Sequence, residues 1–132
     1  MSPTKESENM PVLVVHGLSN TTANQGDINQ FLGWSLPDAA SSVEEMKITR
    51  GLVSVFAPVE VAFNGSYDIV IFVEGLWMRK ERTEEVLQAF AEAINVCAAD
   101  FVQKYVPECN LVEVILRSQR PSDGFASWER SI

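Results

Sequence analysis

The chain has 132 residues, of which 46% are hydrophobic and 21% charged, and its net charge at pH 7 is −8. This length and composition predict one globular domain with a core of its own. The acidic balance argues against a nucleic-acid partner, because a polyanion is bound by a basic face and the ten Lys and Arg residues are scattered. No apolar run approaches the ~20 residues of a membrane span. With no signal-peptide core, we expect a cytoplasmic protein whose two cysteines, Cys97 and Cys109, are reduced.

The first ten residues differ in character from the rest of the chain. Residues 1-10 are expected to be a flexible N-terminal extension or a wrongly assigned start, in front of a domain at 11-132. Met10 and Pro11 stand directly before Val12–His16, an apolar segment typical of a strand. A proline can open a strand because its missing N–H costs nothing there. Alternatively, Met10 is the biological start, and its removal leaves Pro11 as the N-terminal residue.

The pattern between the first two strands is weakly helical. Asp27 is a candidate helix cap, Pro37 breaks or restarts that helix, and residues 43–47 add a further helical turn. A second strand is predicted at Leu52–Phe56. The segment from Val59 through Asn64-Gly65 and onward indicates a hairpin, because Asn-Gly is the favoured two-residue turn.

The second half of the chain has the clearest pattern. Residues 67–73 form an apolar, β-branched run that predicts a buried strand. A long helix is expected from a cap at Thr83 to a stop at Pro107, with apolar residues at helical spacing along one face. Leu111–Ile115 is the next predicted strand. A strand, a crossover helix and a strand form a βαβ unit, in which the two strands pair in parallel.

This unit is predicted twice. Val15-His16-Gly17-Leu18 recurs 58 positions later as Val73-Glu74-Gly75-Leu76, and Leu52-Val53-Ser54-Val55 recurs 59 positions later as Leu111-Val112-Glu113-Val114. Two matches at nearly one offset indicate an internal pseudo-repeat. We therefore expect a parallel pair in each half of the chain, with both helices on one face of the sheet. Because one helical layer covers only one face, the other face should be buried against further subunits.

Residues able to carry chemistry are few. The single His, His16, is more typical of a satisfied imidazole at a strand end than of a base. Glu74 and Glu113 interrupt apolar strands and either face solvent or mark a site with a partner. The two cysteines have no accompanying ligands, and no phosphate-binding loop occurs, so neither a metal nor a cofactor is expected.

The order of elements, with Met-Pro in front of the first strand, resembles the tautomerase superfamily, which includes macrophage migration inhibitory factor. Ala62-Phe63-Asn64-Gly65-Ser66 is similar to a turn of that cytokine, and the segment from Phe72 to Trp77 resembles a little-studied bacterial family of the same fold. The resemblance implies an α/β fold: a tautomerase-like (β-α-β)2 sandwich, with a four-stranded mixed sheet and two helices on one face. It also implies a homotrimer.

What the resemblance implies for function is proton transfer between keto and enol forms of a small carbonyl acid, with Pro11 as the base. A free proline amine can be basic near neutral pH, whereas a proline nitrogen inside a peptide bond is an amide. The enzyme hypothesis therefore depends on Pro11 being N-terminal. By position, the substrate-binding candidates are Lys47, Arg50, Trp77, Met78 and Glu113. Two alternatives stay open: a catalytically inactive oligomer of the same fold, and a ferredoxin-like small-molecule-binding module with an antiparallel sheet.

Overall fold

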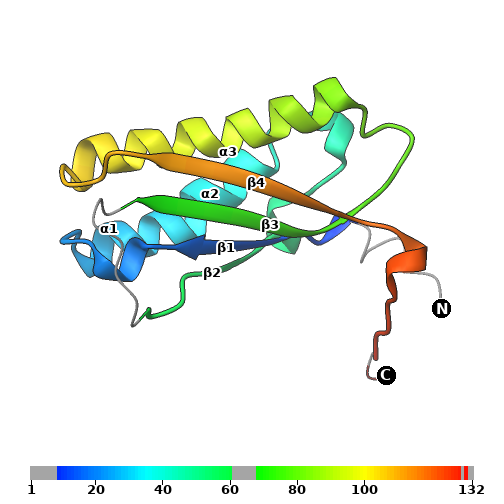
Figure 1. Ribbon diagram of the computed structural model, residues 1–132, viewed down its shortest axis with the longest axis horizontal. Helices are drawn as coiled ribbons and strands as arrows, with labels where there is room; N and C mark the ends of the chain where they lie inside the picture. Colours follow the sequence, from blue (N-terminus) through cyan, green and yellow to red (C-terminus); the bar gives the residue numbers. More distant parts are fainter. Residues whose placement is uncertain (1–8, 61–67, 129, 131–132) are drawn as a thin grey trace.

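The computed structural model describes residues 9–60, 68–128 and 130 as one four-stranded sheet covered by helices (Figure 1). The strands are β1 (Val12–His16), β2 (Ser54–Phe56), β3 (Ile69–Trp77) and β4 (Val112–Gln119), and the α-helices are α1 (Gln25–Gln30), α2 (Leu36–Ala40) and α3 (Glu84–Tyr105). Shorter helical turns are η2 (Leu18–Asn20), η3 (Phe31–Ser35), η4 (Glu44–Met46), η5 (Arg50–Leu52) and η6 (Pro121–Asp123). No helix in this described part is long and apolar enough to cross a membrane.

The sheet has the order β2-β1-β3-β4 and is mixed. β1 pairs with β2 in parallel, β3 pairs with β4 in parallel, and the two halves join through the antiparallel pair β1–β3. Both predicted parallel pairs are confirmed. They exclude the ferredoxin-like alternative, whose sheet would be antiparallel at these places.

Several element boundaries differ from the sequence prediction. β4 begins at Val112 and continues to Gln119, whereas Leu111–Ile115 was predicted. β2 begins at Ser54 rather than Leu52, because residues 50–52 form the turn η5. β3 continues to Trp77, past an irregularity in its pairing with β4 between Val73 and Leu76. The first helix is capped by Asn24, whose side chain accepts from the Asp27 N–H, so the prediction of Asp27 as the cap was wrong. The predicted hairpin lies mostly in residues 61–67, outside the described residues.

The first crossover helix is continuous through Gly33 and through Pro37, the predicted break. α1, η3 and α2 follow one another without interruption, and η3 is a π-helical turn. Pro37 has no N–H to donate to the carbonyl of Gly33, four residues earlier. The helix widens just before this proline: the Leu36 N–H bonds to Phe31 O, five residues back rather than the usual four. A wider turn thus accommodates the proline without ending the helix.

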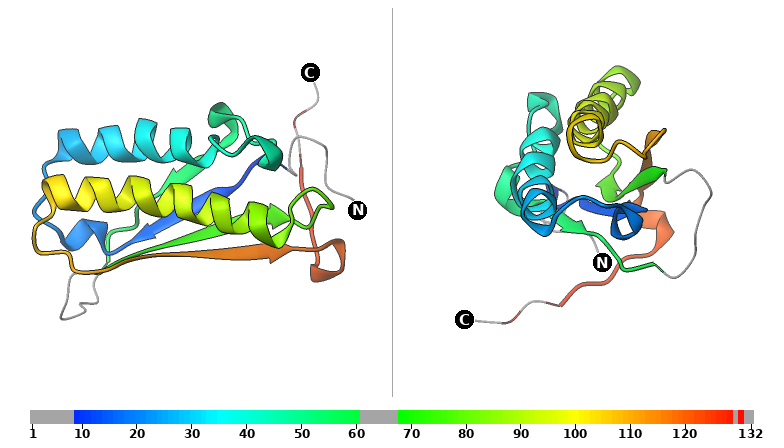
Figure 2. Two further views of the ribbon diagram at one scale, coloured as in Figure 1. Left: turned by 90° about the horizontal axis from the view of Figure 1, so that it is seen from above. Right: turned by 90° about the vertical axis from the view of Figure 1, so that its left-hand side faces the viewer.

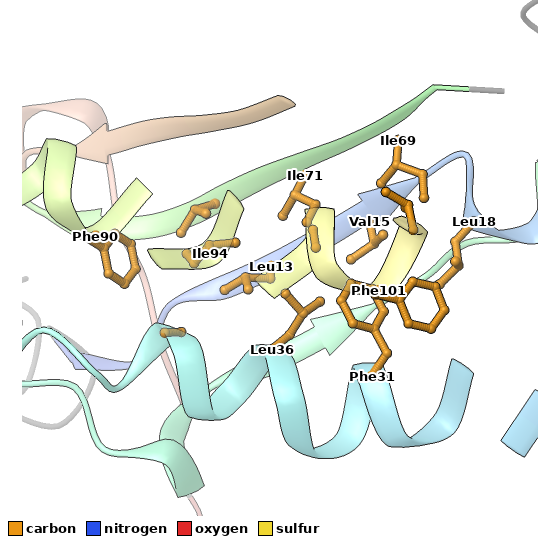
Figure 3. Packing of buried hydrophobic residues seen from close by; sticks show 14 of the residues in the cluster. Leu13, Val15, Leu18, Phe31, Leu36, Ile69, Ile71, Phe90, Ile94 and Phe101 are labelled. Atoms are coloured by element: carbon orange, nitrogen blue, oxygen red, sulfur yellow. The ribbon is translucent and has the colours of Figure 1, made fainter. Parts of the chain in front are cut away.

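The α-helices α1, α2 and α3 lie on one face of the sheet, as predicted (Figure 2). α3 runs along that face for 22 residues and begins where Thr83 accepts a cap bond from the Val86 N–H. The core lies between the two layers and joins sheet residues such as Leu13 and Ile71 to helix residues such as Phe31 and Phe90 (Figure 3).

No α-helix of the described residues covers the opposite face of the sheet (Figure 2). Burial alternates along β1 and along the first part of β3, so every second residue points to this open face. Phe56 and Ile115 are exposed there, and Arg117 lies over the Phe72 ring at 4.2 Å while its Nη1 pairs with Glu74 at 2.9 Å. The open face therefore has apolar side chains at its centre, with an ion pair beside them.

Candidate active site at the start of β1

Pro11 is buried at the point where the chain enters the middle of the sheet. Its carbonyl accepts a hydrogen bond from the Ser54 N–H at 3.1 Å, which fixes it against β2. On the other side the antiparallel register places Val12 opposite Glu74, so Pro11 runs beside Gly75. Gly75 has a φ of +75°, and a Cβ there would stand 3.5 Å from the carbonyl oxygen of Met10. Two strands thus hold the residue predicted as the base.

Two arginines meet beside this strand end. The Asn9 side-chain oxygen accepts from Arg79 Nη1 at 3.0 Å and from Arg82 Nη2 at 3.2 Å. Asn9 is two residues from Pro11 along the chain. Two guanidinium groups on one oxygen are the kind of arrangement that recognises a carboxylate, because the planar donors match its two oxygens.

Arg82 is the buried member of this pair, with only 4% of its surface exposed. It also donates to the carbonyls of Trp77 and Met46, each at 2.9 Å. These bonds compensate the cost of burying the guanidinium and tie the end of β3 to η4. Arg79 is more accessible, and its Nε pairs with Glu81 at 3.5 Å. Arg79 also contributes to the lowered pKa of Glu81, after that residue's own backbone hydrogen bond.

Three of the predicted substrate-binding residues lie near these arginines in the chain or in space. Trp77, whose carbonyl Arg82 holds, is buried and packs edge-on against Phe125 at 4.9 Å. Met78 is exposed, and its N–H donates to Gln119 O at 2.8 Å. Lys47 directly follows Met46 and is exposed, with a left-handed φ of 58° that directs the chain out of η4. Their roles in substrate binding stay predictions.

The other two predicted residues have different surroundings. The Arg50 guanidinium lies over the Trp34 ring, 3.3 Å from its centroid, on the helical layer. Glu113 is exposed on β4 and pairs in register with Val70, whereas Val12 beside Pro11 pairs with Glu74. The structure therefore shows neither side chain in contact with the arginine pair, and a binding role for them also stays a prediction.

Neither Arg79 nor Arg82 was predicted as a site residue from the sequence. The run Arg79-Lys80-Glu81-Arg82 is typical of a solvated turn, and nothing in it distinguishes the buried Arg82 from its neighbours. The available signal was the three-residue spacing of two arginines directly after a strand end. No three His, Cys, Asp or Glu side chains lie close enough to hold a metal ion within residues 9–60, 68–128 and 130.

Solved structures with this fold were found by comparison, although no protein-family model and no curated protein matches the chain. One is a 5-carboxymethyl-2-hydroxymuconate isomerase from Deinococcus radiodurans, 15% identical, with a TM-score of 0.59 over 95% of this chain and 92% of that one. A fused 4-OT protein described as an asymmetric trimer is 12% identical, with a TM-score of 0.58 over 87% and 91%. Macrophage migration inhibitory factor from Toxoplasma gondii is 16% identical, with a TM-score of 0.54 over 92% and 98%.

These neighbours are members of the tautomerase superfamily, and the chain has their fold. At identities of 12 to 16% the likeness concerns the fold, and the chemistry has to be argued from the residues of this chain.

Proposed function

We propose that this chain catalyses keto–enol proton transfer on a small carbonyl acid, with Pro11 as the base when Pro11 is the N-terminal residue. The observation that carries the proposal is the Asn9 oxygen held by Arg79 and Arg82. In a chain that begins at Pro11, a substrate carboxylate takes the position of that oxygen. The fold supports the proposal, because isomerases and a tautomerase occur among its structural neighbours.

The reaction needs one group that takes a proton and one that stabilises negative charge. The Pro11 lone pair takes a proton from the carbon next to the carbonyl, and the C–H electron pair becomes the new C=C bond. The carbonyl π electrons move to oxygen, which takes a proton from water to give the enol, and the Pro11 ammonium returns its proton to water; ketonisation is the reverse. Nearby guanidinium groups favour the neutral amine, which is the basic form, and they hold the substrate carboxylate so that its α-carbon stays at the amine.

We also propose that the protein is a homotrimer whose open sheet faces are covered by neighbouring subunits. The support is the apolar centre of the open face, with Phe56 and Ile115 exposed on it. Two fused 4-OT neighbours are described as trimers, which supports this proposal. The candidate site itself lies within one chain.

The test compares two forms of the protein with phenylenolpyruvate as the probe. The form that begins at Pro11 should accelerate ketonisation, whereas the form that retains residues 1-10 should not, because its Pro11 nitrogen is an amide. Pro11→Ala in the short form keeps a primary amine on the same strand. We expect its kcat to fall about 100-fold, the usual size of a general-base contribution. Equal activity in both forms would show that Pro11 is not the base.

The arginines are tested in the short form with Arg79, the accessible one. Arg79→Met should lower kcat/KM about 10- to 100-fold, because a charge-assisted hydrogen bond contributes about 1.5–3 kcal/mol. Arg79→Lys should recover part of that loss. Glu45→Gln changes the net charge by one unit in the opposite direction at an exposed site on η4, and it should leave the activity unchanged. No activity in any form would favour the catalytically inactive oligomer instead.

A further inference from the structure

A groove of about 540 Å³ lies in the helical layer, between the α1–η3–α2 helix and the second half of α3. Its volume is within the range of small-molecule sites. Its lining does not include Pro11, Arg79 or Arg82. The groove is lined by residues of α1, η3, α2 and α3, which belong to the helical layer and not to the open sheet face.

The wall of the groove is aromatic. Phe31 and Phe101 stack with ring centroids 4.2 Å apart, and Tyr105 lies against Phe101 at 5.4 Å (Figure 3 shows the first two). Trp34 adds a ring that is 51% exposed, although it is the largest side chain of its helix. Trp34 belongs to the π-helical turn η3, a kind of turn that often occurs at functional sites.

The charge around the groove is negative. Among the described residues that line it, Asp27, Asp38 and Asp100 each carry a carboxylate and Lys104 carries an ammonium. The pKa of the Cys97 thiol reflects these negative charges. Burial, followed by the charges of Asp100 and Asp38, raises that pKa to about 11. Two carboxylates on different helices therefore act on one point of the groove, where a positive charge is favoured.

The aromatic rings of this region also attract cations. The Arg50 guanidinium lies 3.3 Å from the Trp34 ring centroid, and the Lys104 ammonium lies 5.2 Å from the Tyr105 ring centroid. A cation over an aromatic face is attracted by the ring quadrupole. Apolar rings beside acidic side chains are complementary to a molecule with an apolar body and a positive end.

We propose that this groove binds an organic amine, whose ammonium group lies between Asp38 and Asp100 and whose apolar body lies against Phe31 and Phe101. The site is separate from the start of β1 and does not depend on the chemistry of Pro11. Its ligand class is opposite in charge to the carboxylic acid proposed for the arginine pair. The chain then has two sites of opposite electrostatic preference, one at the strand end and one between the helices.

The test uses the full chain and 2-phenylethylamine as the probe, followed by the backbone amide signals of the protein in solution NMR. We expect saturable shifts on α2 and on the second half of α3, with a Kd of about 1 mM or tighter for a ligand of this size. Two matched probes share the phenyl body: 2-phenylethanol is neutral and phenylacetate is an anion. Both should bind at least about tenfold more weakly, and added salt should weaken only the amine.

Two variants assign the charge. Asp38→Asn and Asp100→Asn keep the side-chain shape, and each should raise the Kd of the amine about tenfold. Glu45→Gln, exposed on η4, changes the net charge equally and should have no effect. Equal binding of the amine and the alcohol, no saturable shift up to about 10 mM, or shifts away from these helices would overturn the proposal. If a variant does not fold, the probe series and the salt dependence in the unaltered protein decide alone.

Discussion

Gly17 is the residue whose replacement should damage the fold most directly. It ends β1 with a φ of +93°, and its N–H donates to Glu60 Oε1 at 2.6 Å. A Cβ at this position would overlap the carbonyl oxygen of Asp68, directly before β3. The close approach of two strand ends therefore requires a residue without a side chain here.

We expect Gly17→Ala to lower the free energy of unfolding by about 3 kcal/mol, the sum of the left-handed backbone and the overlap. Gly33→Ala is the matched control, because Gly33 lies in a helix with nothing within 4 Å of an added Cβ. That change should stabilise the protein by up to about 1 kcal/mol. Urea unfolding monitored by circular dichroism measures both; a Gly17→Ala protein as stable as Gly33→Ala would contradict this account of the turn.

Among single residues, the sequence predicts a role for Pro11 but not the burial of Arg82. Pro11 is found from the local sequence alone, since Met-Pro before an apolar strand is visible in three residues. The burial of Arg82 depends on carbonyls at Met46 and Trp77 and on the Asn9 side chain, which reach it from 36, 5 and 73 positions away. No local pattern encodes such a meeting of separate segments.

Among the elements, α3 depends on a defined start. Thr83 is its N-cap, and the side-chain oxygen accepts from the Val86 N–H at 3.3 Å, while Glu84 and Glu85 lie in the first turn. These features satisfy a backbone donor and complement the helix dipole.

Thr83→Ala should lower the free energy of unfolding by about 1 kcal/mol, the usual cost of losing an N-cap. Thr49→Ala is the control, because Thr49 stands in the same position before η5 but its side chain makes no cap bond. We expect that variant to be within about 0.5 kcal/mol of the original protein, as surface changes usually are. Thermal unfolding of both proteins measures the difference, and equal losses would show that the cap bond of Thr83 contributes nothing specific.

The two crossovers show how far sequence patterns predict elements. α3 was predicted almost completely, because its apolar period is uninterrupted from Thr83 to Pro107. The first crossover was not, because Gly33 and Pro37 are typical of a helix end. In the structure the π-helical turn accommodates both residues, because a backbone hydrogen bond there spans five residues instead of four. Pro37 is buried and α2 packs against α3, a tertiary contact that composition does not report.

For the whole molecule, the decisive property is the state of assembly. A sheet with helices on one face leaves apolar strand residues uncovered on the other. Ile115 is 41% exposed there, close to the Arg117 that lies over Phe72. Covering this face is the structural reason for the trimer proposed above.

Sedimentation at micromolar concentration should therefore give three times the 14.7 kDa chain mass. Ile115→Asp should shift the protein towards monomer, because a carboxylate would be buried without a partner in the assembled face. Val96→Asp introduces the same charge on the helical layer, at a residue that is 59% exposed, and should leave the mass unchanged. A stable monomer of the unaltered chain would contradict the assembly.

The hydrogen bonds of Asn9 also have a consequence for regulation, under the function proposed here. Asn9 would then be a tethered competitor of the substrate carboxylate, because its oxygen is presented to Arg79 and Arg82 by the same chain. Its effective concentration is then about millimolar or higher, whatever the concentration of protein. A single cleavage before Pro11 would remove this competitor and create the basic amine in the same step. The long form would be a zymogen, and its activation would be irreversible.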